Sequence, residues 1–463
     1  MAGYIAGSLV GVVAVSLLFR HLGVVAIGQY ITALSLVAIL TAVSDLGMTA
    51  VGVRELSRRP PDQRWPLARQ LLGLRITLTS IGTVVIVVVA WLVYSPTLAA
   101  GVALASVGLL LQVTQENLAL PLLVGLRLGW IAALETSRLL LTTSLTIILV
   151  VAGATLVPFL GISIPVGVAI LVATVLLVRG TGSLKPAFSL SHWRAFLRPM
   201  LPYSAAAATA MLYFRVSILL VSVLGSALEL GYFSASFRII EVLVAVPGLL
   251  VGSALPIFAH SAGKDDERLG YALARVFEVS LIVGSWVAVS TAVGAPLAIA
   301  IVGGPKFAPA APVLAVQGIA LGALFVSLVW ANGLLGLGAY RTILAINIGG
   351  LIFTAALVAP LVLLDGAQGA AIGTAIGEIV LALADCLAVI HRRPQLRPSL
   401  RIIPGVALAT AIGLAPLALT GIPVIGRLLI STTVFGAVVL ATHAYPPELV
   451  ELVPGLRTRS SRA

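Results

Sequence analysis

The sequence has little charge and a single cysteine. Only 10% of its 463 residues are Asp, Glu, Lys or Arg, whereas soluble globular proteins have about 25%. The single cysteine, Cys386, lies in an apolar run, so neither a disulfide framework nor a thiolate metal site is expected. The chain is instead 60% hydrophobic, which indicates a polytopic membrane protein.

Signatures of enzyme chemistry are also missing. There is no GxxxxGK[ST] phosphate-binding loop, no HExxH zinc motif and no GxSxG nucleophile elbow, and the five histidines are scattered at loop or span ends. The longest predicted loops, 51–70 and 179–199, have no room for a folded catalytic domain. We therefore expect a protein that is not an enzyme and has no cofactor, with a coupling cation, Na⁺ or H⁺, as an open alternative.

Apolar runs of about 20 residues predict fourteen transmembrane helices and an all-α integral membrane fold. These runs lie near 2–19, 29–50, 71–94, 98–121, 129–151, 154–178, 200–224, 231–257, 276–302, 310–334, 342–364, 367–390, 402–420 and 428–445. The first run has no basic region before it and no clear cleavage site, so we expect a retained helix rather than a signal peptide.

The positive charges orient these spans. Of the 28 lysines and arginines, 21 fall in the even-numbered loops and the C-terminal tail, and three fall in the odd-numbered loops. Cytoplasmic loops are enriched in Lys and Arg, so we expect a multi-pass protein of the cytoplasmic membrane with both termini in the cytoplasm. This distribution also argues against a nucleic-acid partner for the net charge of +12.

The basic stretch 179–199 divides the first twelve spans into two halves. We predict an N-terminal lobe at 1–178, a cytoplasmic linker at 179–199 that is partly an amphipathic helix on anionic lipid, and a C-terminal lobe at 200–390. Residues 391–463 then hold two further helices and a basic tail.

The second half carries a weak repeat of the first. A shift of 202 positions aligns residues of the first hairpin with residues of the seventh and eighth spans: Leu22, Gly23 and Tyr30 with Leu224, Gly225 and Tyr232. Internal repeats of this kind are typical of secondary transporters, whose sites lie at the junction of the two copies.

Charged residues inside the predicted spans are the first candidates for a site. A charge at the bilayer centre costs about 2.5–3.5 kcal/mol on insertion scales, so it usually faces a bundle interior or a wet cavity. These residues are Asp45, Glu116, Glu135, Arg138, Arg215, Arg238, Glu241, Glu278, Glu378 and Asp385.

Among the basic members of this set, Arg215 has no acidic residue within a turn of its own helix. We expect it to face a cavity and to contact a carboxylate of another helix, a phosphate or water. Arg238 and Glu241 are spaced i, i+3, as are Glu135 and Arg138, so each pair either neutralises itself or serves the substrate.

The acidic candidates for coupling-ion binding or gating are Asp45, Glu116, Glu241 and Glu378. Asp45 can hydrogen-bond a neighbouring helix, bind a cation or pair with Arg54. Glu116 stands beside Gln112, Gln115 and Asn117, a cluster that suits either interhelical hydrogen bonds or a ligand. Glu378 and Asp385 are seven residues apart and share a helix face, as a cation or proton site would require.

Short motifs in a fixed order resemble those of the polysaccharide and O-unit flippases, a family of the multidrug/oligosaccharidyl-lipid/polysaccharide exporter superfamily. Near the start they are Arg20-His-Leu-Gly23, Gly28-Gln-Tyr30, Asp45-Leu-Gly47 and Arg54-Glu55. In the middle they are Leu201-Pro-Tyr203, Tyr213-Phe-Arg215 and Gly231-Tyr-Phe-Ser-Ala235, and later Gly304–Pro312, Asn332–Gly338 and Gly369–Ala375.

The resemblance implies two six-helix lobes related by a pseudo-two-fold axis along the membrane normal, around a V-shaped cavity. Helices one, two, seven and eight would line that cavity, and Arg20, Arg54, Arg215 and Arg238 would contact a lipid pyrophosphate. Many relatives have an Asp two residues after the arginine of helix seven, where this chain has Ser217.

We therefore expect a flippase that moves a polyprenyl-pyrophosphate-linked oligosaccharide from the inner to the outer leaflet by alternating access, for cell-surface polysaccharide biosynthesis. Its expected partners are that lipid, membrane lipids and glycan polymerases or glycosyltransferases. The alternatives are a cation-coupled multidrug exporter of the same superfamily, a membrane polymerase or ligase of lipid-linked glycans, and a non-transporting member of a glycan assembly complex.

Overall fold

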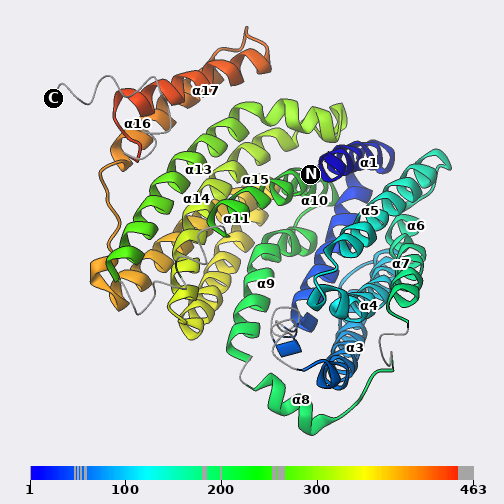
Figure 1. The fold of residues 1–463 in the computed structure, drawn as a ribbon. Coiled ribbons are helices and arrows are strands. Elements are labelled where there is room, and N and C mark those ends of the chain that lie inside the picture. Colours follow the sequence, from blue (N-terminus) through cyan, green and yellow to red (C-terminus); the bar gives the residue numbers. More distant parts are fainter. Residues whose placement is uncertain are drawn as a thin grey trace. The chain divides into compact units, whose positions relative to one another are not determined.

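The structure is all-helical, as predicted. The computed structural model describes residues 2–45, 48, 52, 55–56, 60–179, 185–198, 201–252, 258 and 266–446, and these contain helices and turns but no strand (Figure 1). Within these ranges, eleven helices are long and apolar enough to cross a membrane. The all-α membrane fold is therefore confirmed, whereas the count of fourteen spans stays a prediction.

Two helices are much longer than a membrane is thick. Helix α1 (Ala2–Asp45) has 44 residues and α15 (Tyr340–Arg392) has 53. A straight helix of 53 residues would be about 80 Å long, against a hydrocarbon core of about 30 Å. Both contain a break in helical geometry, at Gly23 with φ 76° in α1 and at Asp365–Gly366 in α15, so each accounts for two of the predicted spans.

Helix contacts divide the chain into two compact units. The first unit is Met1–Ser234 with Val302–Lys306, and the second is Ala235–Ile301 with Phe307–Ala463. These units group residues by contact and do not test the predicted lobes, so the lobe boundaries and their pseudo-symmetry stay a prediction.

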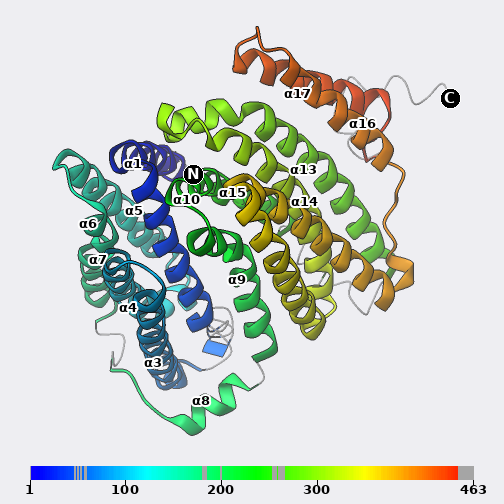
Figure 2. The same ribbon diagram turned by 180° about the vertical axis from the view of Figure 1, so that it is seen from behind.

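The first unit is built around α1. Its other helices are α3 (Pro61–Val93), α4 (Pro96–Val124), α5 (Leu128–Val151), α6 (Leu156–Gly161), α7 (Ser163–Val178), α8 (Leu190–Leu197) and α9 (Leu201–Leu224). Helix α1 packs against α3, α4, α5 and α9, and α4 packs against α3 and α7 (Figures 1 and 2). A Cβ at Gly108 would lie 2.1 Å from Oγ of Ser163, so α4 and α7 pack closely through a small residue.

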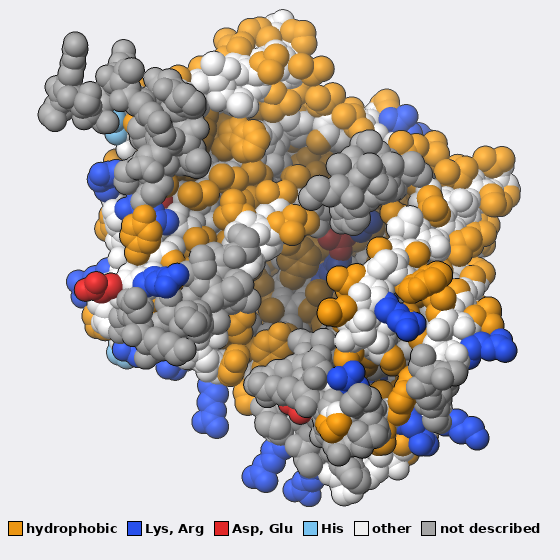
Figure 3. All heavy atoms as spheres, viewed as in Figure 1, with side chains coloured by type: hydrophobic (Ala, Val, Ile, Leu, Met, Phe, Trp, Pro, Cys, Tyr) orange, Lys and Arg blue, Asp and Glu red, His pale blue; other side chains and the backbone are white. Residues whose placement is uncertain are grey.

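The outer faces of these helices suit lipid. Along α3, Val84, Trp91 and Leu92 are exposed, and apolar side chains cover much of the visible surface (Figure 3). Lys and Arg side chains project at the end of this unit where α3 and α8 lie. This distribution is typical of a protein whose helix flanks contact hydrocarbon and whose ends contact headgroups.

The linker contains the predicted helix, α8, and it is fixed along α3. The backbone N–H of Ala187 donates to the carbonyl of Arg69 at 2.9 Å, Nε of Arg69 donates to the carbonyl of Lys185 at 2.8 Å, and Nε1 of Trp193 donates to the carbonyl of Gln70 at 3.1 Å. The linker therefore carries its own interactions with the first unit.

The two hairpins aligned by the 202-residue shift meet in the first unit. A Cβ at Gly28 would lie 2.8 Å from Cγ of Leu230, the residue that the shift aligns with Gly28, and a Cβ at Gly231 would lie 2.3 Å from the carbonyl oxygen of Val24. Contact between equivalent positions is what a pseudo-two-fold axis would produce. Glycine is required here because the backbones approach too closely for a side chain.

The second unit holds the remaining helices. They are the end of α10 (Ala227–Leu243), α11 (Ala245–Gly252), α13 (Asp266–Val302), α14 (Ala310–Gly336), α15, α16 (Ile403–Leu414) and α17 (Val424–Ala441), with short 3₁₀ turns at Pro394–Leu396 and Ala415–Ala418. A further 3₁₀ turn, Pro305–Phe307, begins in the first unit and ends in the second. In α15 the glycines at 369, 373 and 377 lie against Leu361, Val358 and Thr354, so its second half folds back on its first. Val289 and Val293 of α13 share a core with Ala409, Phe435 and Val439 of α16 and α17.

Candidate functional site

A three-residue charge cluster joins α1, α3 and α4 in the first unit. Arg75 of α3 is 4% exposed, and its Nη2 lies 3.1 Å from Oδ1 of Asp45 and 3.0 Å from Oε2 of Glu116. Gln112 also donates to Oε1 of Glu116, at 3.0 Å. One guanidinium therefore holds two of the predicted coupling candidates, and Asp45 pairs here across helices.

A second polar network lies beside this cluster. Gln115 donates to Oγ1 of Thr174 on α7 at 3.1 Å, and Arg138 of α5 donates to the side-chain oxygen of Gln115. Nε of Arg138 also lies 3.5 Å from the carboxylate of Glu135, so the predicted i, i+3 pair forms. These contacts connect α4, α5 and α7 and match the interhelical interpretation of the Gln115 region.

Arg215 belongs to α9 and is buried where that helix packs against α1. It is 7% exposed, and its Nη1 donates to Oγ of Ser35 at 3.3 Å. The guanidinium carbon also lies 5.4 Å from the centre of the Phe214 ring. A positive charge is therefore buried within the predicted seventh span, next to α1, which begins the first of the two hairpins aligned by the 202-residue shift.

Arg20, which the resemblance also implies as a phosphate contact, differs from Arg215. Arg20 is exposed, and its side chain lies beside Gly304, within 4 Å of where a Cβ on that glycine would be. Arg20 therefore lies on α1 beside the turn that follows α13, with its side chain exposed rather than buried as that of Arg215 is. Arg54 lies outside the described residues.

In the second unit, Arg238 and Glu241 form the predicted pair within α10. Nη1 of Arg238 lies 2.5 Å from Oε2 of Glu241, and the two side chains are 32% and 23% exposed. Arg215 and Arg238 belong to different units, so the cavity of four arginines stays a prediction.

Glu378 and Asp385 are both buried on the second half of α15. Oγ of Ser327 on α14 donates to Oδ2 of Asp385 at 3.0 Å, which connects this face to the neighbouring helix. Within the part of the chain that the structure describes, no three His, Cys, Asp or Glu side chains form a group that could hold a metal ion.

Arg75 was not predicted as a site residue from the sequence, and neither were its ion pairs with Asp45 and Glu116. The available signal was an arginine inside an apolar run, which needs anionic neighbours at that depth. Its partners are 30 and 41 positions away in the sequence, so no spacing within one helix could identify them.

Residues 17–312 match a protein-family model described as "Polysaccharide biosynthesis protein". No curated protein sequence is significantly similar to the chain.

Several solved structures share the fold. The lipid II flippase MurJ in an inward closed conformation aligns with a TM-score of 0.73 and 14% identity over 96% of this chain and 97% of that one. A multidrug resistance MATE transporter of the MOP superfamily, in an inward-facing conformation, aligns with a TM-score of 0.63 and 17% identity over 84% and 95%. A MOP superfamily transporter from Pyrococcus furiosus, described as having a binding pocket of reverse polarity, aligns with a TM-score of 0.57 and 16% identity over 86% and 94%.

At these identities the structural similarity establishes the fold, and the family model covers more than half of the chain. The fold is thus one that a lipid II flippase and a multidrug resistance transporter share. The chain belongs to the polysaccharide biosynthesis protein family.

Proposed function

We propose that the protein is a flippase of the cytoplasmic membrane, with both termini in the cytoplasm. It moves a polyprenyl-pyrophosphate-linked oligosaccharide from the inner to the outer leaflet by alternating access, and it makes or breaks no covalent bond. The family's connection with polysaccharide biosynthesis and the fold shared with a lipid II flippase support this substrate class. Glycan polymerases or glycosyltransferases would supply or consume the lipid.

The observation that carries the proposal is Arg215. It places a guanidinium at 7% exposure within an apolar span, beside Ser35 of α1. A pyrophosphate head needs cationic partners once it leaves bulk water, and arginine offers two parallel hydrogen bonds to a phosphate. The neutral hydroxyl of Ser35 can yield its bond to such a ligand without leaving a buried charge behind.

A cation-coupled multidrug exporter is the second candidate, because MATE transporters share the fold. Such an exporter needs carboxylates that can bind cationic substrates or coupling ions. In the first unit, both Asp45 and Glu116 contact Arg75, so neither can bind a cation freely without giving up an ion pair, which favours the flippase. Glu378 and Asp385 are then the candidates for coupling to Na⁺ or H⁺.

The deciding experiment measures access of a lectin to a lipid-linked oligosaccharide that starts in the inner leaflet of reconstituted vesicles. Wild-type protein is expected to expose the sugar outside, and Arg215→Gln is expected to stop it. Arg341→Gln removes the same charge from an exposed position at the start of α15 and is expected to behave as wild type.

Two other results would contradict this proposal. Extrusion of a cationic dye driven by an imposed Na⁺ or H⁺ gradient, with no movement of the sugar, would establish the exporter instead. Equal flipping by wild type and by a folded Arg215→Gln protein would remove Arg215 from the substrate path.

A further inference from the structure

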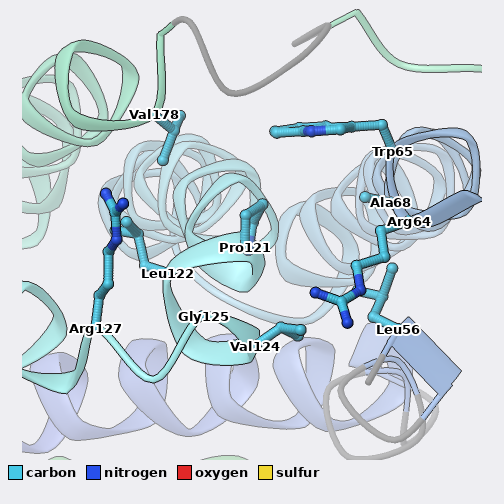
Figure 4. A pocket seen from close by; sticks show the side chains of 10 residues that line it. All are labelled: Leu56, Arg64, Trp65, Ala68, Pro121, Leu122, Val124, Gly125, Arg127 and Val178. Carbon is cyan, nitrogen blue, oxygen red and sulfur yellow. The ribbon is translucent and has the colours of Figure 1, made fainter. Parts of the chain in front are cut away.

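The first unit contains a pocket far from Arg215 in the chain, at the ends of α3, α4 and α7. Its volume is about 230 Å³, and the residues that line it include Arg64 and Trp65 from the first turns of α3, Pro121 and Leu122 near the end of α4, and Arg127 from the turn after α4. Figure 4 shows the two arginines on opposite sides of Pro121, each coming from a different element. The pocket thus combines an apolar floor with two cationic walls.

The turn that carries Arg127 has a specific backbone geometry. The N–H of Arg127 donates to the carbonyl of Leu122 at 2.8 Å and the N–H of Leu126 donates to the carbonyl of Leu123 at 3.1 Å, which is the hydrogen-bond pattern of a Schellman helix end. Leu126 has φ 54°, in the left-handed region where glycine is usual, at a cost of about 1–2 kcal/mol. The chain thereby reverses so that Arg127 lines the pocket while Leu126 points outward.

The exposed residues of this turn suit the membrane interface. Leu126 is 80% exposed, and Leu128 and Trp130, which follow Arg127, are also exposed. Alternating Leu, Arg and Trp side chains place an apolar edge in the acyl region and a charge at the headgroups, with tryptophan at the boundary.

The chemistry of the pocket selects an anionic headgroup. By the positive-inside distribution, the loops that carry Arg64 and Arg127 face the cytoplasm, so the pocket lies at the level of the inner-leaflet headgroups. Ligand pockets for drug-sized molecules are about 300–1,000 Å³, so this smaller space suits a phosphate and its glycerol rather than an oligosaccharide. Arginine provides the planar donors that phosphate oxygens accept.

We propose that this pocket binds the phosphate of an anionic phospholipid of the inner leaflet, between Arg64 and Arg127, with Trp65 and Leu122 against the start of the lipid chains. Because its walls come from α3, α4, the turn before α5 and the end of α7, a bound lipid connects four helix ends of the first unit. The site is separate from the Arg215 region and does not depend on the transported substrate.

The test is thermal unfolding of the full-length protein in a neutral detergent, with added phosphatidylglycerol, phosphatidylcholine or inorganic phosphate. Phosphatidylglycerol is expected to raise Tm by about 5 °C, and the other two additions by less than about 1 °C. Arg64→Gln with Arg127→Gln is expected to lose most of the rise. Arg397→Gln with Arg401→Gln removes two exposed charges elsewhere and is expected to keep it.

A second variant guards against misfolding of the double substitution. Val124→Trp fills the pocket from the partly exposed end of α4 without removing a charge, and it is expected to abolish the response to phosphatidylglycerol. The proposal is overturned if either pocket variant responds as wild type does, if inorganic phosphate alone gives the same rise, or if the Arg397 and Arg401 variant loses the response equally.

Discussion

Two buried arginines of the first unit are held in different ways. Arg75 is 4% exposed and lies between the carboxylates of Asp45 and Glu116, at 3.1 and 3.0 Å. Arg215 is 7% exposed, donates to the neutral hydroxyl of Ser35 at 3.3 Å and lies beside the Phe214 ring.

In the proposed flippase, Arg75 is a structural charge and Arg215 is a charge that binds the lipid head. Arg75 forms ion pairs with two carboxylates, so moving it would break both pairs and leave two negative charges without their shared cation. In the flippase proposal, Arg215 exchanges its hydrogen bond to the hydroxyl of Ser35 for one to a phosphate oxygen. We therefore expect substitution of Arg75 to lower the stability of the protein and substitution of Arg215 to lower the rate of transport.

The largest effect is expected at Arg75. Arg75→Met removes the buried cation that Asp45 and Glu116 share, and because those two side chains are 27% and 36% exposed, the expected cost is about 2 kcal/mol. Thermal unfolding in detergent should show a large fall in Tm. The triple variant with Asp45→Asn and Glu116→Gln removes all three charges and should recover most of the loss. A triple variant as unstable as Arg75→Met alone would mean that packing, not charge, explains the cost.

At Arg215 the effect is expected in transport. Arg215→Gln should lower the flipping rate about 100-fold, because loss of one partner from a buried charge pair costs about 2–5 kcal/mol. Arg215→Lys keeps the charge but loses the planar fork, so a fall of about 10-fold is expected. Initial rates of lectin access in vesicles measure both. Equal rates for the Gln and Lys variants would show that charge at this position is unimportant.

A substitution at Ser35 can place a carboxylate beside Arg215, as Asp45 and Glu116 lie beside Arg75. Ser35→Asp places a carboxylate beside the guanidinium, which should raise stability by about 1 kcal/mol and lower the flipping rate about 10-fold, since a phosphate must now displace an anion. Ser35→Asn introduces a side chain of nearly the same shape as aspartate but without its charge, and it serves as the control. Flipping at the wild-type rate by Ser35→Asp, with Tm raised, would show that Arg215 does not contact the lipid head.

Interactions within one helix could be predicted from the sequence, and those between helices could not. The Arg238–Glu241 and Glu135–Arg138 pairs follow from an i, i+3 spacing, and the apolar runs predict the helices. Arg75 meets carboxylates of two other helices, so its role depends on which spans are neighbours. A hydrophobic pattern contains no such information when every face of a span is apolar.

The exact geometry of the two longest helices, α1 and α15, depends on neighbouring helices in the same way. The breaks at Gly23 and at Asp365–Gly366 occur where the sequence predicts separate spans, yet the helices continue on both sides with almost no loop. The pocket between Arg64 and Arg127 was not expected at all, because its walls come from parts of the chain that only the packing of α3 and α4 brings together.

The smallest effect is expected where a charge pair is partly exposed. Arg238–Glu241 and Arg275–Glu278 share the i, i+3 spacing and an N–O distance of 2.5 Å, but the acidic side chain is 23% exposed in the first pair and 3% in the second. Glu241→Gln should therefore change stability by about 0.5 kcal/mol, and Glu278→Gln by about 1 kcal/mol, because the attraction of the buried Glu278 carboxylate to Arg275 is less screened by water, although Arg238 and Arg275 are almost equally exposed, at 32% and 30%. Tm measurements on the two variants, made side by side, compare them directly. Equal losses would show that burial does not decide whether a charge in this protein is structural, and the distinction between Arg75 and Arg215 would then rest on transport alone.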